Sequence, residues 1–214
     1  MGLNFSKQFL PIFLLIVLIL VWASVWSLFK IAIEAIPPLS FRVIIGIPAF
    51  ALLLFLGFKK VKTVYIPRSD FKPLLLISFF NVTLWQVLML YGINMLGGGR
   101  AAVLTYTMPV WATIFASIFG YEKINISIII SLIFGMTGII FLSLEINVFE
   151  NMLGFLITLS AGLSWAIGTM IVKYGGIKSD GLIVAGWQQI IGIFPIIPFA
   201  LYFDLNNFGL INYT

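Results

Sequence analysis

Residues 9–29 read FLPIFLLIVLILVWASVWSLF, a stretch without a single charged side chain. A helix needs about 20 apolar residues to cross the hydrocarbon core of a bilayer, and this stretch is long enough. It is too long for the apolar region of a signal peptide, and no small-x-small cleavage pattern follows it before Lys30. We therefore predict that it is a retained transmembrane helix.

Six more apolar runs follow, separated by breaks such as Pro37-Pro38, the charged stretch from Lys59 to Lys72, and Gly97-Gly98-Gly99. The runs are too long and too uniformly apolar for the alternating strands of a barrel. We therefore predict an all-α, polytopic transmembrane helix bundle. The predicted spans cover residues 9–29, 39–57, 73–93, 101–119, 126–144, 152–172 and 181–203.

The composition of the 214 residues supports the same class, since 62% are hydrophobic and only 9% are charged. Soluble domains usually carry about 25% charged residues. The net charge of +5 comes mostly from basic residues between the runs, which indicates membrane topology rather than nucleic-acid binding. The chain has no Cys and no His. Without an acidic cluster either, we expect no enzyme activity, no metal site and no cofactor.

The basic residues also predict an orientation, because Lys and Arg collect on the cytoplasmic side of membrane proteins. With the N-terminus inside, the outer segments hold only Lys30 and Arg100. We therefore predict a multi-pass protein of the cell (plasma or inner) membrane with a cytoplasmic N-terminus. The inner segments would hold Lys7, Lys59, Lys60, Lys62, Arg68, Lys72, Lys123, Lys173 and Lys178.

Two blocks of sequence recur along the chain. Trp22-Ala23 and Lys30 recur as Trp165-Ala166 and Lys173 at a constant offset of 143 residues. The block Ile44-Ile45-Gly46-Ile47 recurs at 190–193, at an offset of 146. The alternative is chance similarity between apolar helices that contain tryptophan.

A recurrence at this spacing predicts a repeat of five helices, over residues 1–145, and a partial second copy with two helices, over 152–214. Because five is odd, the second copy would enter the membrane from the opposite side. Inverted repeats of this kind are typical of secondary transporters, which bind substrate near the midplane between the halves.

The residues also resemble a known family, the EamA-type transporters of the drug/metabolite transporter superfamily. Leu20-Val21-Trp22-Ala23-Ser24-Val25-Trp26, then Lys30, Pro37-Pro38 and Phe41-Arg42, resemble the opening of these proteins. The stretch from Tyr91-Gly92 to Gly99-Arg100-Ala101-Ala102, followed by Tyr106-Thr107-Met108-Pro109 and Glu122, resembles their third-to-fourth-helix signature. The resemblance implies ten helices in two inverted halves that move small metabolites or drugs by alternating access.

The chain departs from that pattern, because it supplies the first half and only two helices of the second before Thr214. It therefore resembles a fragment, a truncated gene product or a divergent short form. The alternative to a transporter is a truncated or accessory membrane protein without transport activity of its own. An incomplete half would leave packing faces uncovered. A homodimer could cover them, although nothing in the sequence requires one.

Polar and aromatic side chains inside the predicted spans are the candidates for contact with a small-molecule substrate. Trp22 and Trp26 are four residues apart and so share a helix face, as do Asn81 and Trp85. The alternative is that the amides join helices and the tryptophans fill space. The predicted substrate-binding residues are Trp22, Trp26, Arg42, Asn81, Trp85, Tyr106, Thr107, Trp165 and Gln188.

Arg42 and Pro109 each allow two interpretations. Arg42 lies near the outer end of its run, where it would either extend to the headgroups or bind an anion at the cavity mouth. Pro109 lies near the centre of the fourth run and would kink it. The kink would act as a gate, or it reflects the commonness of proline in membrane helices. No Asp or Glu lies in the middle of any run, so we expect uncoupled diffusion or exchange rather than proton-coupled export.

Overall fold

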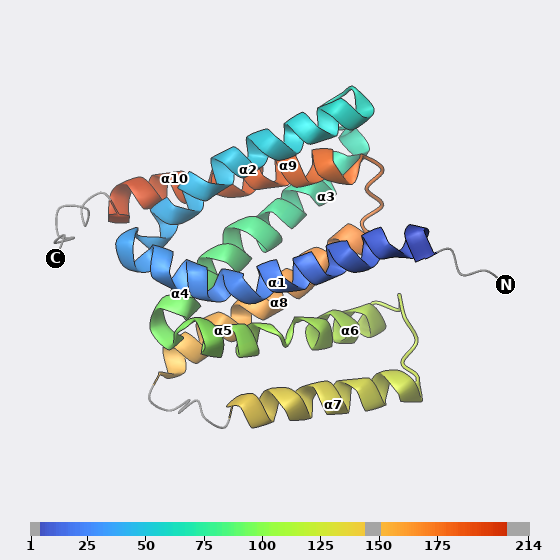
Figure 1. Cartoon of the computed structure of the whole chain (residues 1–214), viewed down its shortest axis with the longest axis vertical. Coiled ribbons are helices and arrows are strands. Elements are labelled where there is room, and N and C mark those ends of the chain that lie inside the picture. The colour runs from blue at the N-terminus through green and yellow to red at the C-terminus, as the bar shows by residue number, and fades with distance from the viewer. Residues whose placement is uncertain (1–4, 144–150, 205–214) are drawn as a thin grey trace.

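The computed structural model describes residues 5–143 and 151–204, and its elements are helices throughout these ranges (Figure 1). Within them, six helical stretches are long and apolar enough to cross a membrane, and the shorter apolar helix Ile126–Phe141 accompanies them. The prediction of an all-α polytopic bundle is confirmed. Glu145 and Glu150, which the sequence places between two spans, lie outside the described residues.

Each predicted span corresponds to one helix or to a stack of short helices. The first two spans are α1 (Phe5–Ala35) and α2 (Pro38–Val61). The third consists of α3 (Arg68–Ser78), the π-helix η1 (Phe79–Leu84) and α4 (Trp85–Leu96), and the fourth of α5 (Gly98–Thr105) and α6 (Met108–Ile118). The last three are α7 (Ile126–Ser143), α8 (Met152–Tyr174), and α9 (Gly181–Ile193) continued by α10 (Ile196–Phe199) and the π-helix η2 (Ala200–Asp204).

Local chemistry sets several of these boundaries. Pro38 occupies the first position of α2, where its missing N–H costs nothing because that donor would have no partner within the helix. Asn151 caps α8 by accepting a hydrogen bond from the Gly154 N–H at 2.9 Å, and Asp180 caps α9 by accepting one from the Leu182 N–H at 2.9 Å. These caps satisfy donors that would otherwise be exposed at the helix starts.

Three connections meet at one end of the bundle, which we call the basic end: residues 62–67, 119–125 and 175–180 (Figure 1). Lys60 Nζ lies 2.7 Å from Asp180 Oδ2, and the Trp187 indole N–H donates to the Val64 carbonyl at 2.8 Å. The buried Asp70 carboxylate accepts hydrogen bonds from the backbone N–H of Lys178 and Ser179. The stretch from Lys59 to Lys72 and the segment around Lys178 therefore lie at the same end.

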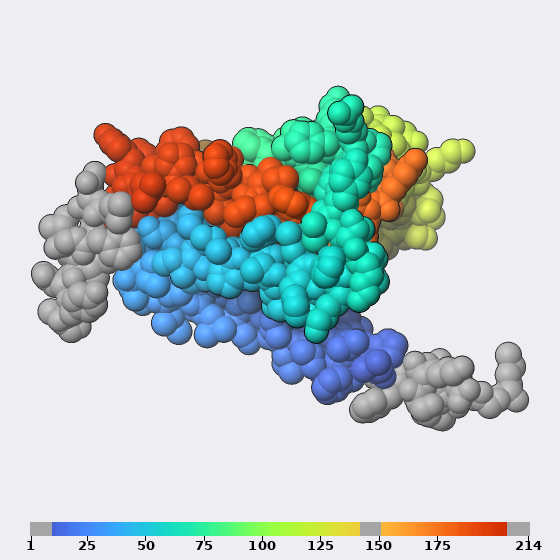
Figure 2. Space-filling view, turned by 90° about the horizontal axis from the view of Figure 1, so that it is seen from above, coloured from blue at the N-terminus to red at the C-terminus, as the bar shows by residue number. Residues whose placement is uncertain are grey.

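Helices α2 and α9 lie side by side across one face of the molecule (Figure 2). Glycines let them approach closely: Gly46 abuts Ile193, and Gly57 abuts Ile183. A glycine of α9 makes the same kind of contact with α2: a Cβ on Gly186 would lie 3.1 Å from the Leu54 backbone nitrogen. Since lipid removes the hydrophobic drive for helix association, close van der Waals contact of this kind holds membrane helices together.

Helix α8 is the second centre of packing, in contact with α3, η1, α4, α5 and α6. Ser164 and Gly168, a small-x-x-x-small pair, lie at these contacts. Helix α1 is different, because most side chains from Leu10 to Val21 are exposed. Apolar side chains exposed along a membrane span can face lipid without cost.

Candidate functional site

A pocket of about 170 Å³ lies between α1 and α4. Trp26 is buried, with 5% of its surface exposed, whereas Trp22 is 41% exposed. The two tryptophans line the pocket together, as their spacing predicts. The lining consists of Trp22, Val25, Trp26, Phe29, Trp85, Gln86 and Met89.

The turn between α4 and α5 fixes the position of Trp26. Gly97 has φ +84°, a left-handed conformation that L-residues with a side chain rarely adopt. The next residue, Gly98, packs so tightly that a Cβ there would lie 2.7 Å from the Trp26 carbonyl oxygen. Tyr106 contacts the same tryptophan edge-on, with ring centroids 6.2 Å apart. The glycine motif of the sequence thus supports the wall of the pocket.

The π-helix η1 interrupts the third span; it contains Asn81 and ends just before Trp85. The Trp85 N–H donates to the Phe80 carbonyl, five residues back, instead of the residue four back. Asn81 consequently faces α8, where it fills the space left by Gly168, while Trp85 lines the pocket against α1. Asn81 and Trp85 therefore contact different neighbours, which differs from the prediction of one shared face. A π-bulge inside an α-helix is often found at a functional site.

The fourth span breaks at Tyr106-Thr107, just before Pro109. Pro109 has no N–H for the Thr105 carbonyl, which a regular helix would supply. A Cβ built on Gly162 of α8 would lie 3.2 Å from that carbonyl oxygen and 3.0 Å from Thr107 Oγ1. The break is thus packed against α8, with Pro109 itself exposed and Thr107 buried.

Among the described residues, buried side-chain polar atoms without a hydrogen-bond partner are few, and they concentrate inside the spans. Such atoms are costly in a low-dielectric interior unless a ligand or water satisfies them. Asn81 and Trp85 of the candidate set contribute two of them. The full set is Arg42 Nε, Asn81 Oδ1, Trp85 Nε1 and Trp111 Nε1.

Arg42 does not extend to the headgroups, because its side chain is only 4% exposed. It donates to the side-chain oxygen of Gln189, and no carboxylate within 5–143 and 151–204 forms an ion pair with it. Gln188 points elsewhere, with Nε2 3.4 Å from the Ile77 carbonyl oxygen. Arg42, Gln188 and the half-buried Trp165 do not line the pocket between α1 and α4.

A second polar cluster lies at the basic end, where Glu122 binds Lys173 in an ion pair and accepts a hydrogen bond from the Tyr174 hydroxyl at 2.7 Å. Glu122 and Lys173 line a pocket of about 160 Å³ between α6 and α8. The hydrogen bonds from Lys173 and Tyr174 hold the pKa of Glu122 below its usual range. This cluster ties the connection after α6 to the end of α8.

Some contributors were not among the predicted site residues. Gln86 lines the pocket, and Gln189 rather than Gln188 binds Arg42. A π-helix has no sequence signature of its own, so the rotation that it imposes on Trp85 and Gln86 could not be foreseen. The glycines of α8 were visible as small residues, but the sequence did not tell which side chains they would meet.

Comparison of the sequence with known proteins identifies a matching family and several relatives. Residues 9–144 match the model of the EamA-like transporter family. The uncharacterized transporter YoaV of Bacillus subtilis is 28% identical over 191 residues, which are 86% of this chain and 64% of YoaV. The uncharacterized transporter YvbV of the same organism is 28% identical over 181 residues, 84% of this chain and 59% of YvbV.

The uncharacterized inner membrane transporter YedA of Escherichia coli is 28% identical over 171 residues, which are 77% of this chain and 54% of YedA. The chain thus spans between about half and two thirds of the length of these relatives. No solved structure matches it significantly. Because the family match covers well over half of its residues, the chain belongs to the EamA-like transporter family.

Proposed function

We propose that the protein is a permease that moves a small organic solute by alternating access, with the pocket between α1 and α4 as part of its substrate site. The observation that carries the proposal is the lining of this pocket: three tryptophans and an amide on two membrane-spanning helical stretches, with the buried Trp85 indole N–H unpartnered. Aromatic walls with a few polar groups are typical of small-molecule sites.

The size of the pocket limits the solute. Its volume of about 170 Å³ is below the roughly 300–1,000 Å³ of most ligand sites. The pocket would therefore hold a compact solute or a single ring, and it would widen when the halves move. A moderately apolar solute with a hydrogen-bond acceptor for Trp85 fits this chemistry.

The break before Pro109 would be the moving part. Tyr106 lies at the break and contacts Trp26, so a change of angle between α5 and α6 would be transmitted to the pocket wall. Asn81 and Thr107 face α8 at Gly168 and Gly162. They would make the contacts that change when α8 shifts. The recurrence of the pattern of α1 in α8 supports a two-part arrangement with inverted halves. The distribution of Lys and Arg supports a cytoplasmic N-terminus.

The test is uptake into proteoliposomes that contain the purified chain, with a panel of labelled metabolites followed by counterflow. For a transported solute, Trp85→Phe keeps an aromatic, though smaller, ring and removes the N–H, and should raise KM roughly fivefold. Trp187→Phe is the matched control, because its N–H already donates to the Val64 carbonyl outside the pocket. Its KM should stay at the wild-type value. Absence of saturable uptake for every solute would overturn the proposal.

A further inference from the structure

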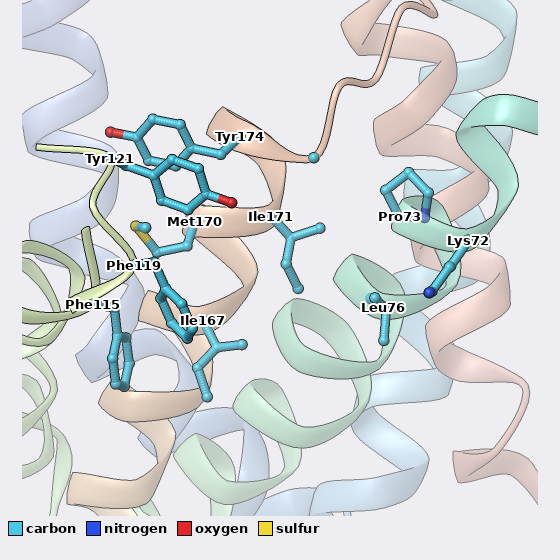
Figure 3. Close-up of a pocket in the computed structure, with 11 residues that line it drawn as sticks. Lys72, Pro73, Leu76, Phe115, Phe119, Tyr121, Ile167, Met170, Ile171 and Tyr174 are labelled. Atoms are coloured by element: carbon cyan, nitrogen blue, oxygen red, sulfur yellow. The ribbon is translucent and has the colours of Figure 1, made fainter. Parts of the chain in front are cut away.

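A groove of about 510 Å³ lies at the basic end between α3, α6 and α8, on residues that the proposed substrate site does not use (Figure 3). Its volume falls within the roughly 300–1,000 Å³ of well-formed ligand sites. Lys72 reaches it from α3, Phe115 from α6, and Ile167 and Ile171 from α8.

The groove changes character along its length. Tyr121 and Tyr174 stack on each other at the basic end, with ring centroids 4.1 Å apart and an interplanar angle of 4°. Farther along the spans, Leu76, Phe115 and Ile167 provide purely apolar walls (Figure 3). Tyrosines are enriched at the membrane interface, and apolar side chains at acyl-chain depth. The groove therefore matches an amphiphile that lies parallel to the helices.

The positive charge of Lys72 at the mouth of the groove favours an amphiphile with an anionic headgroup. Lys72 lines the groove, and its amino group forms no ion pair with any carboxylate in residues 5–143 and 151–204. The carboxylates nearby are already engaged: Asp70 by Ser179, Glu122 by Lys173, and Asp180 by Lys60. An anion arriving at Lys72 would therefore meet a cation that is free to bind it.

Other basic residues near the groove also favour an anionic headgroup. Arg68 precedes Lys72 by one helical turn, and Lys123 and Lys178 lie in the neighbouring connections. None of these three forms an ion pair within the described part of the chain. Basic clusters beside membrane spans attract anionic lipids at about 1 kcal/mol per Lys or Arg.

We propose that this groove binds one anionic phospholipid of the surrounding leaflet, with an acyl chain along α6 and α8 and the phosphate at Lys72. The occupant is a membrane lipid rather than a transported solute. The site therefore stands or falls independently of the proposed permease activity.

The test titrates the purified protein in detergent with dioleoyl phosphatidylglycerol or dioleoyl phosphatidylcholine and counts bound lipids by native mass spectrometry. The first bound phosphatidylglycerol should bind roughly fivefold more tightly than phosphatidylcholine. Lys72→Gln should abolish this preference. Leu76→Trp should weaken both lipids, because the larger ring fills the apolar part of the groove.

Lys62→Asn is the matched control, because it removes a charge at the same end but outside the groove, and Asn tolerates the left-handed backbone of Lys62 (φ 59°). This variant should keep the wild-type preference for phosphatidylglycerol. Equal binding of the two lipids to the wild type would overturn the proposal, as would an equal loss in Lys62→Asn and Lys72→Gln. Oleate that displaces phosphatidylglycerol at equal concentration would also overturn it, because the site would then belong to free fatty acids.

Discussion

At the scale of single residues, close contacts between a glycine and a group on the facing helix determine how α8 packs on the third and fourth spans. The Asn81 amide occupies the space where a side chain of residue 168 would lie, and the Thr105 carbonyl at the helix break packs against Gly162 in the same way. Thr158 of α8 packs likewise against Gly92 of α4. Such positions leave no room for one more methyl group, and they set the register of the helices.

Gly168→Ala should therefore destabilise the protein. The added Cβ would overlap the Asn81 amide, so the Asn81 side chain or the helix pair would have to shift. Overpacking of this kind costs about 1–3 kcal/mol. The measurement is the melting temperature in detergent. Gly135→Ala is the control, since a Cβ there meets no atom within 4 Å, and it should be neutral or slightly stabilising.

The ion pair of Glu122 predicts how the stability of the protein depends on pH. Its pKa is lowered in the folded protein by hydrogen bonds from Lys173 and Tyr174, so the folded state is favoured above the usual glutamate pKa of about 4.3. That contribution is lost as the pH falls through the lowered pKa. The melting-temperature difference between wild type and Glu122→Gln should therefore be largest near neutral pH and vanish in acid.

Glu34→Gln is the matched variant for this experiment. It removes the exposed pair with Lys30, in which Nζ and Oε1 are 3.4 Å apart. Exposed pairs of this kind contribute little to stability, so its melting temperature should follow the wild type at every pH. A difference for Glu122→Gln that does not change with pH would contradict the assignment.

At the scale of elements, the irregular segments carry the functional proposal. The third span contains a π-helix, and the fourth a break, both where they meet α8. At the π-helix, the Ser164 hydroxyl of α8 donates to the Phe80 carbonyl at 2.7 Å, and this carbonyl also accepts the Trp85 N–H. In the last span, the Gly192 carbonyl accepts from Thr83 at 2.6 Å, close to the turn at Phe194-Pro195. Polar contacts of this kind allow helices to shift without stranding a donor in lipid.

Pro109→Ala tests the break directly. The new N–H can reach the Thr105 carbonyl, so the angle between α5 and α6 should become stiffer. Transport should then slow several-fold, with the melting temperature unchanged or higher. Pro48→Ala, in α2 and away from the pocket, is the control and should leave the rate unchanged. Equal rates in Pro109→Ala and wild type would remove the break from the mechanism.

The sequence predicted elements far better than it predicted their contacts. Every apolar run is one helix or a stack of short helices, because length and hydrophobicity favour a helical crossing of the bilayer. Trp22 and Trp26 share a pocket because α1 is regular, so the spacing rule holds. The rule failed for Asn81 and Trp85, where a π-turn changes the register. The burial of Arg42 against Gln189 depends on how α2 and α9 pack. A single sequence does not reveal that packing.

At the scale of the whole molecule, α2 and α9 form one join between the first five helical stretches and the two that follow, and α8 forms the other against the third and fourth. Gly46 and Gly192, which occupy equivalent places in the recurring block, both lie at tight helix contacts, against Ile193 and Val82 respectively. At the basic end, Lys60 and Asp180 connect the same two parts at 2.7 Å. A rocking motion between the parts would pivot about this join.

We propose that the second part repeats the first with its orientation inverted, so that α1 and α8 end on opposite faces of the membrane. Because the chain has no native cysteine, single cysteines can be placed at Glu34, Lys62 and Lys178 and labelled with an impermeant maleimide in intact cells and in inverted vesicles. The account predicts that Lys62→Cys and Lys178→Cys react from one face and Glu34→Cys from the other. Labelling of Glu34→Cys and Lys178→Cys from the same face would contradict it.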